Sequence, residues 1–259
     1  MLYIHENNLL NKIASNYKGH GTKLQEFYAS KYIPARSALE ALVFTEANKS
    51  AFAKAAKIIN DYYKEIESFS HKYTITSQSK FASTFLEEIS TYLFKDIAEI
   101  QSGEFGVFNK SIYAGLKIDK NKRISLLTKD VDFCIGKKVA ISIDQQPPTE
   151  LILPIVTVEV KTYLDATMFG EIKSSSKAIR SASPNSKTYV LMGYKCLADE
   201  HIIAARQDAT LSEMFVLRKN ETSPIDAQAL YLYWHEIVAA INDITTDNEI
   251  VVPGKLLQV

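Results

Sequence analysis

The most informative part of the sequence is residues 151–168, which read LILPIVTVEVKTYLDATM. The first ten are almost all apolar, a pattern typical of a strand that is buried on both faces, and Pro154 is expected to mark its entry. Two charged residues, Glu159 and Lys161, stand at the end of this strand. Residues 166–182 then have the apolar spacing of a helix. A buried strand that leads directly into a helix predicts an α/β core.

The residues on either side extend this core. Upstream, residues 111–118, 123–127, 131–135 and 139–143 are short β-rich runs separated by charged or glycine-containing turns, which predict an antiparallel meander. Downstream, residues 188–192 and 214–217 are expected to form strands, and residues 224–242 a final helix with proline in its first turn. We therefore expect an α/β fold: a mixed sheet with an antiparallel meander, flanked by helices.

The first hundred residues predict helices instead of strands. Residues 49–69 and 79–100 both have apolar side chains at helical spacing, and Gly103 is a typical stop signal for the second helix. The sequence thus predicts two regions. Residues 1–77 form an N-terminal helical region, and residues 78–259 form the α/β core with its C-terminal helix.

The composition excludes several classes of protein. The chain has 259 residues, of which 46% are hydrophobic, too many for a disordered chain. It has no run of about 18 apolar residues, so we expect no membrane span. Residues 1–18 lack the basic and apolar segments of a signal peptide. The two cysteines are too few for a disulfide framework or a Cys-rich zinc site, which favours a reducing interior.

Charge is distributed unevenly along the chain. The 30 basic residues balance the 30 acidic ones, which taken alone argues against a protein that binds nucleic acid. Residues 105–195, however, contain 14 basic and 8 acidic residues, a net charge of +6, and the rest of the chain carries −6. A basic middle segment fits a local surface that binds a polyanion, although solvated lysines that cluster by chance would give the same count.

One group of side chains has the chemistry of a metal-dependent hydrolase. Asp132 opens an apolar strand, and Glu159 and Lys161 share one face of the buried strand, because side chains in a strand alternate. Two charges on an apolar strand are costly unless something compensates them. A divalent cation between Asp132 and Glu159 would do so, and Lys161 would hold or activate a water beside it. These groups suit phosphodiester hydrolysis; a cross-strand ion pair is the structural alternative.

The spacing of these residues resembles that of a known family. Asp132 followed by Glu159-Val160-Lys161 is similar to the D…(D/E)xK signature of the PD-(D/E)XK nuclease superfamily, although Val131 stands where the family often has proline. The run EVKTYLDATM at 159–168 resembles a group of type II restriction endonucleases, as do residues 129–133 and 215–219. This resemblance covers roughly residues 78–243. It implies a restriction-endonuclease-like core with an N-terminal helical elaboration.

The resemblance also implies further site residues. The family often adds a carboxylate from a preceding helix, and here Glu88 is preferred to Glu87, because Glu88 borders the apolar face of the predicted helix. The carbonyl of Val160 is a candidate third metal ligand. Asp130 competes with Asp132 for the same role, but it precedes the strand instead of opening it.

Three basic residues on the predicted helix 166–182 are candidate DNA contacts. Lys173, Lys177 and Arg180 occupy positions i, i+4 and i+7 and so form one stripe. A stripe of this kind suits contacts with phosphates. A solvated helix face is an equally good interpretation.

The resemblance implies a Mg²⁺-dependent type II restriction endonuclease that cuts both strands of double-stranded DNA at a short specific site. It also implies a dimer of identical or different subunits, a cognate DNA methyltransferase in the same system and a location in the bacterial cytoplasm. Two alternatives stay open. One is a DNA repair or junction-resolving nuclease with the same core, and the other is a non-catalytic DNA-binding or assembly protein in which the acid pair is structural.

Overall fold

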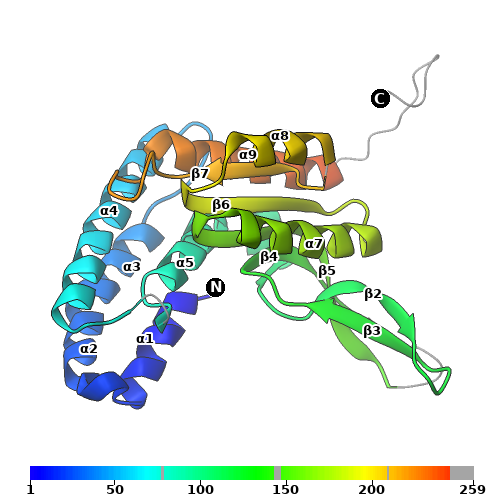
Figure 1. Cartoon of the computed structure of the whole chain (residues 1–259), viewed down its shortest axis with the longest axis horizontal. Coiled ribbons are helices and arrows are strands. Elements are labelled where there is room, and N and C mark those ends of the chain that lie inside the picture. The colour runs from blue at the N-terminus through cyan, green and yellow to red at the C-terminus, as the bar shows by residue number, and fades with distance from the viewer. Residues whose placement is uncertain (77–78, 143–146, 209, 246–259) are drawn as a thin grey trace.

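The computed structural model of the chain describes residues 1–76, 79–142, 147–208 and 210–245, and its centre is a mixed β-sheet (Figure 1). Within these residues, seven strands form the sheet. They are β1 (Gly106–Phe108), β2 (Ile112–Ile118), β3 (Ile124–Lys129), β4 (Phe133–Ile141), β5 (Thr149–Leu164), β6 (Lys187–Lys195) and β7 (Glu213–Val216). Helices flank the sheet, which confirms the predicted fold class.

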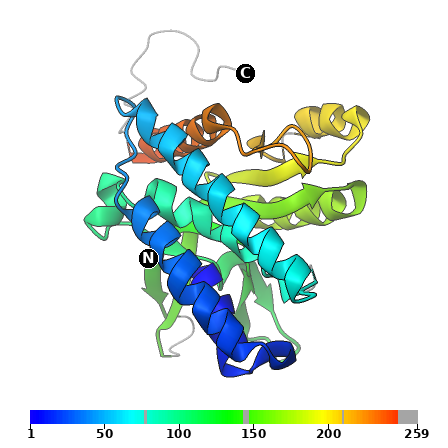
Figure 2. The ribbon, with the colours of Figure 1, turned by 90° about the vertical axis from the view of Figure 1, so that its left-hand side faces the viewer.

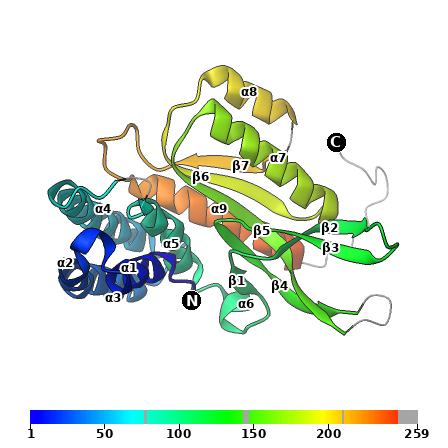
Figure 3. The ribbon, with the colours of Figure 1, turned by 60° about the horizontal axis from the view of Figure 1, so that its bottom comes forward.

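The long strand β5 organises the sheet because it pairs with three other strands. β4 runs antiparallel along one edge of β5 and also pairs with β1. On the other edge, β2 pairs with the first half of β5 at Ile112↔Ile152, and β6 runs parallel to its second half, from Val156 to Leu164. β7 then extends the sheet beyond β6. The β2–β3 ribbon projects from the body, as do the C-terminal end of β4 and the N-terminal end of β5 (Figure 3).

The strand boundaries differ from the prediction at β4 and β5. The runs predicted at 131–135 and 139–143 belong to one strand, β4, and residue 143 lies outside the described residues. Pro154 lies inside β5 instead of at its entry. The sheet accommodates this proline because the register of the β4–β5 pair shifts where Pro154 faces Gly136. A Cβ at Gly136 would lie 2.5 Å from the carbonyl oxygen of Leu153, so a glycine is needed there.

The N-terminal region is helical, as predicted. It contains α1 (Ile4–Ala14), the short helix η1 (Tyr17–Gly19), α2 (Gly21–Phe27), the π-helical turn η2 (Tyr28–Tyr32), α3 (Ile33–Glu40) and α4 (Lys49–Lys72). The long helix α4 runs beside α1, α2 and α3 on the outside of the molecule (Figure 2). Its buried residues are the apolar ones that the sequence placed at helical spacing, together with Ala51.

The helix predicted at 79–100 is two helices. α5 (Ser83–Phe94) ends before α6 (Ala98–Gln101), and Ile97 between them has an extended backbone. The Asp96 carboxylate accepts a hydrogen bond from the backbone N–H of Phe44, a long-range contact at the point where α5 has ended. Gly103 follows α6 with a φ of +78°, in agreement with its predicted role as a stop signal.

Three further helices follow the strands. α7 (Ala166–Ala182) has the predicted boundaries and begins at Asp165, whose carboxylate caps the helix by accepting from Met168 N at 2.9 Å. α8 (Asp199–Asp208) is not anticipated by the sequence pattern. α9 (Ala227–Thr245) is the predicted last helix, but it begins after Pro224, so the proline precedes the helix instead of lying in its first turn. Among the described residues, no helix is long and apolar enough to cross a membrane.

Hydrophobic clusters pack on both faces of the sheet. On one face, β-strand residues such as Val158 and Leu191 pack with α5, α9 and the N-terminal helices in a cluster that extends from Leu9 to Ile241. On the other face, α7 and α8 pack against Val190 and Met192. The helical region and the sheet therefore share one continuous core across the expected boundary between residues 1–77 and 78–259.

Candidate active site

The register of the β4–β5 pair brings Asp132 level with Glu159. Phe133, the first residue of β4, pairs with Val158. In an antiparallel pair, the preceding residue Asp132 then lies opposite Glu159. Lys161 shares the face of Glu159 because alternate residues of a strand point the same way. The structure thus brings together the three residues on which the predicted site depends.

The ammonium group of Lys161 bridges the two carboxylates. Lys161 Nζ lies 2.9 Å from Asp132 Oδ2 and 3.2 Å from Glu159 Oε2. The same Asp132 oxygen accepts a hydrogen bond from the backbone N–H of Val160 at 2.7 Å. The side chains of Asp132, Glu159 and Lys161 are 25%, 18% and 29% exposed, so the cluster is open to solvent yet partly desolvated. This geometry fixes Asp132 and leaves both carboxylates accessible.

Burial and neighbouring charges shift the pKa values of Glu159 and Lys161. The pKa of Glu159 is raised to about 7, chiefly by burial and then by the charge of Asp132, and the nearby Lys161 only partly opposes this. Burial disfavours the charged form of Lys161, but the two carboxylates outweigh it and raise its pKa. Lys161 is therefore protonated at neutral pH, and Glu159 is poised to exchange a proton there.

A third acid, Glu87 of α5, lies close enough to the same cluster for the charges there to shift its pKa. Burial and the charge of Asp132 raise the pKa of Glu87 to about 7, while Lys80 and Lys161 act in the opposite direction. Between Thr84 and Phe94, Glu87 is the one residue of α5 that is not fully buried. The sequence contains a sign of this role for Glu87. An acid on a helix that is apolar on most sides must contact solvent or other charged groups.

Glu88, in contrast, is not part of the cluster, so the expectation that it contributes there is corrected. Its side chain is fully buried and faces the N-terminal helices. One carboxylate oxygen accepts from the hydroxyls of Tyr32 and Tyr92, and the other accepts from the backbone N–H groups of His5 and Glu6. Glu88 does border the apolar face of its helix, but that face carries a buried polar network instead of the site.

The structure also separates Asp130 from Asp132. The Asp130 carboxylate accepts a hydrogen bond from Ser111 N at 3.1 Å, at the start of β2. Asp130 thus closes the loop that leads into the β2–β3 ribbon. Asp132, which contacts Val160 and Lys161, is the aspartate of the cluster.

The basic stripe lies on α7, with three different environments. Lys173 Nζ lies 5.6 Å from the centre of the Phe169 ring. Lys177 is exposed. Arg180 lines a hollow of about 500 Å³ together with Lys187 and Tyr189. The stripe follows the helix away from its N-terminus, which joins the end of β5 next to the cluster.

The donor set of the cluster suits a hard divalent cation. Carboxylate oxygens are the preferred ligands of such ions, and Asp132 and Glu159 supply them at one place. Among the residues that the structure describes, no three His, Cys, Asp or Glu side chains come close enough to hold a metal ion by themselves. An ion would therefore be held by Asp132 and Glu159, with the remaining positions filled by backbone, water or substrate.

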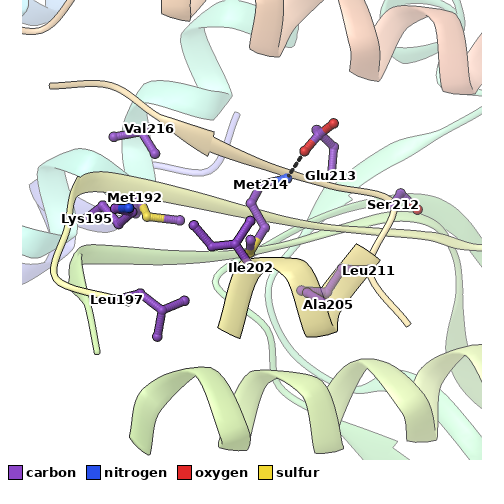
Figure 4. A pocket seen from close by; sticks show the side chains of 10 residues that line it. All are labelled: Met192, Lys195, Leu197, Ile202, Ala205, Leu211, Ser212, Glu213, Met214 and Val216. Atoms are coloured by element: carbon purple, nitrogen blue, oxygen red, sulfur yellow. Dashed lines mark hydrogen bonds between the residues drawn. The ribbon is translucent and has the colours of Figure 1, made fainter. Parts of the chain in front are cut away.

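The acidic cluster is separate from the cavity beside α8. A cavity of about 390 Å³ beside α8 is lined mainly by apolar side chains from β6, α8 and β7 (Figure 4). Met192 of this cavity pairs with Lys161 in the β5–β6 register, but none of the three acids lines it. The cluster instead lies at the surface, which suits a large substrate better than a small enclosed one.

Comparison with known proteins identifies the part of the chain that carries this cluster. Residues 78–242 match the family model described as "Bpu10I restriction endonuclease". The fold is similar to a chain of a solved structure titled "native BbvCI A2B2 tetramer at low resolution", with a TM-score of 0.76, 15% sequence identity, and coverage of 94% of this chain and 98% of that chain. No curated protein matches the chain in sequence.

Proposed function

The chain belongs to the Bpu10I restriction endonuclease family, and we propose that it is a type II restriction endonuclease of the PD-(D/E)XK superfamily. On this proposal it hydrolyses phosphodiester bonds in both strands of double-stranded DNA at a short specific site, with Mg²⁺ as cofactor. The observation that carries the proposal is the Lys161 ammonium group between the carboxylates of Asp132 and Glu159.

Each residue of the cluster has a role in this proposal. Asp132 and Glu159 bind the cation, with the Val160 carbonyl as a further ligand. A cation held there supplies charge stabilisation at the phosphoryl group and lowers the pKa of a bound water. Lys161 is protonated, because its pKa is raised, so it orients the attacking water by donating a hydrogen bond and does not remove its proton.

Glu87 takes the role first expected of Glu88. Its pKa of about 7 suits a group that accepts a proton near neutral pH. After burial, the negative charge of Asp132 does most to raise this pKa, so the Glu87 carboxylate interacts electrostatically with the cluster. We propose that Glu87 positions a water or a second cation and accepts a proton from the attacking water.

Contacts with DNA and with partner subunits are also part of what we propose. Lys173, Lys177 and Arg180 of α7 are proposed phosphate contacts. Residues 78–259 would carry the nuclease core and residues 1–77 would support it. The similar structure contains a BbvCI A2B2 tetramer, and we propose that this chain also acts as a dimer or larger assembly of identical or different subunits. A cognate methyltransferase and a cytoplasmic location complete the proposal.

The test is cleavage of supercoiled plasmid DNA with Mg²⁺, where nicks and double-strand breaks are both visible. The wild-type chain should give discrete fragments, and Asp132→Asn, Glu159→Gln and Lys161→Ala should each lower the rate by about 100-fold or more. The matched control is Glu171→Gln, because Glu171 belongs to a second Glu-x-Lys triplet that lies on α7.

Three outcomes would contradict parts of the proposal. Absence of nicking and of cleavage in Mg²⁺ and Mn²⁺ would favour a non-catalytic DNA-binding protein. Cleavage confined to branched DNA would favour a junction-resolving nuclease. Full activity of the Lys161→Ala variant would show that the chemistry lies elsewhere in the chain.

A further inference from the structure

We propose that Arg218 binds a phosphodiester of the DNA next to the candidate active site, in the hollow that it lines with Tyr63 and Lys64. This inference rests on the proposed function. It assigns a role to residues 215–219, a segment whose sequence resembles restriction endonucleases but which the acidic cluster does not include.

The guanidinium group of Arg218 is held in place but not satisfied. The backbone N–H of Arg218, just beyond the end of β7, donates to Gly193 O at 2.8 Å. The guanidinium carbon lies 4.5 Å from the centre of the Tyr63 ring, a cation–π arrangement. Nη1 makes one long hydrogen bond of 3.4 Å to the carbonyl oxygen of Glu221, and Nε is buried with no partner. A buried arginine nitrogen with an unused N–H is rare inside a protein unless a ligand completes it.

The surrounding hollow is large enough for a segment of DNA backbone. Its volume is about 670 Å³, and its lining includes Asn60, Tyr63, Lys64, Glu67, Arg218 and Glu221. The side-chain amide of Asn60 is already engaged on both sides with the backbone of Ile225. Arg218 and Lys64 are therefore the cationic donors that line the hollow, and a planar guanidinium is well suited to two oxygens of one phosphate.

The sheet links this hollow to the acidic cluster. Lys161 pairs with Met192 across β5 and β6, and the next residue, Gly193, accepts the backbone hydrogen bond of Arg218. Arg218 therefore lies at the same end of the sheet as Lys161. On the helix side, the ring of Tyr63 packs 5.4 Å from the ring of Phe85, two residues before Glu87 on α5. A strand of DNA at Asp132 and Glu159 would have its neighbouring phosphates within reach of this region.

Two acids at the rim of the hollow distinguish a phosphate from a base edge as the ligand of Arg218. Glu67 and Glu221 line the hollow and are exposed. If a phosphate binds Arg218, both carboxylates repel it, so their neutralisation should strengthen binding. If instead Arg218 and an acid together read the edge of a base pair, the acid contributes a hydrogen-bond acceptor and its loss should weaken binding.

The experiment measures binding of a fluorescein-labelled DNA duplex by the full chain in chelator, over a series of salt concentrations. We expect Arg218→Gln to reduce the slope of log K against log[salt] by about 1, the value for one lost phosphate contact. Glu221→Gln and Glu67→Gln should raise affinity. The matched control is Lys23→Gln, an exposed lysine of α2, and the melting temperature of each variant checks that it folds.

The outcomes separate this inference from the proposed function. A wild-type chain that neither binds the duplex nor cleaves plasmid DNA in Mg²⁺ would overturn both. A wild-type chain that cleaves DNA, with an Arg218→Gln variant of unchanged slope, would overturn the phosphate site alone. Weaker binding by Glu221→Gln would replace the phosphate with a base edge as the ligand of Arg218.

Discussion

Glu87 and Glu88 are neighbours on α5, and their carboxylates belong to different parts of the molecule. Glu88 accepts hydrogen bonds from two tyrosine hydroxyls and from two backbone N–H groups of α1. Glu87 instead responds to the charges of Asp132 and Lys161. The helix is thus fixed from one side by a buried network and presents an acid to the cluster on the other.

This pair predicts opposite effects of the same substitution. Glu88→Gln puts an amide NH₂ where two donors already point, so it should lower the free energy of unfolding by about 2–4 kcal/mol. Glu87→Gln should leave stability nearly unchanged and reduce cleavage by roughly 10–100-fold. Chemical denaturation and plasmid cleavage measure the two quantities. Equal loss of stability in both variants would contradict the separation of roles.

Binding of the cation should depend on pH near neutrality. The pKa of Glu159 is raised to about 7, so below this pH a proton competes with the metal at this carboxylate. We expect the affinity for Mg²⁺ to fall by up to about tenfold per pH unit for each proton displaced. Isothermal titration calorimetry at several pH values tests this. An affinity that does not change between pH 6 and 8 would contradict it.

His5 should make the fold sensitive to acid. Its ring is fully buried, lies 3.0 Å from Thr84 Oγ1 and 2.8 Å from the Tyr62 hydroxyl, and burial lowers its pKa from 6.5 to about 3. Below pH 6.5 the unfolded chain binds a proton that the folded chain does not, so stability falls toward pH 3 by up to about 1.4 kcal/mol per pH unit.

The raised pKa of Glu88 acts in the opposite direction, so the measurement is the difference between wild type and His5→Gln. The difference in free energy of unfolding between wild type and variant should shift against the wild type as the pH falls, because the variant has no His5 ring that binds a proton on unfolding. Urea denaturation at pH 7, 6 and 5 gives the comparison. Parallel curves for the two proteins would show that His5 does not titrate in this way.

Gly193 tests the packing beside Lys161, and Gly170 is its control in an open environment. A Cβ at Gly193 would lie 2.4 Å from the carbonyl oxygen of Thr162, so Gly193→Ala must push β5 and β6 apart. We expect a loss of about 1–3 kcal/mol in stability, together with slower cleavage. A methyl group at Gly170 of α7 would have no heavy atom within 4 Å, so Gly170→Ala should stabilise the helix by about 0.5–1 kcal/mol. Thermal unfolding measures the stability of both variants. Melting temperatures equal to that of the wild type in both would contradict both expectations.

Much of this arrangement was predictable because local patterns agree with the tertiary structure. The apolar run before Glu159 becomes the central strand β5, and α7 begins and ends where its pattern does. The triad of Asp132, Glu159 and Lys161 follows from strand alternation and from the resemblance to nucleases. Its assembly in space follows from the β4–β5 register.

The remaining features depend on contacts between segments far apart in the sequence. A helical wheel assigns Glu88 to the apolar side of its helix but cannot reveal that Tyr32 and the first turn of α1 supply hydrogen-bond donors there. Pro154 suggests the start of a strand, and only the irregular pairing with Gly136 shows how a proline fits inside it. The environment of Arg218 depends on the position of Tyr63, more than 150 residues away.

The continuous core between the N-terminal helices and the sheet has a consequence for how such enzymes can change. Modular exchange of residues 1–77 between relatives would cut through packed side chains, among them Tyr32, whose hydroxyl donates to Glu88. A chimera would therefore need matching substitutions on α5 and α9. We expect recombination within the family to preserve the helical region together with its own α/β core.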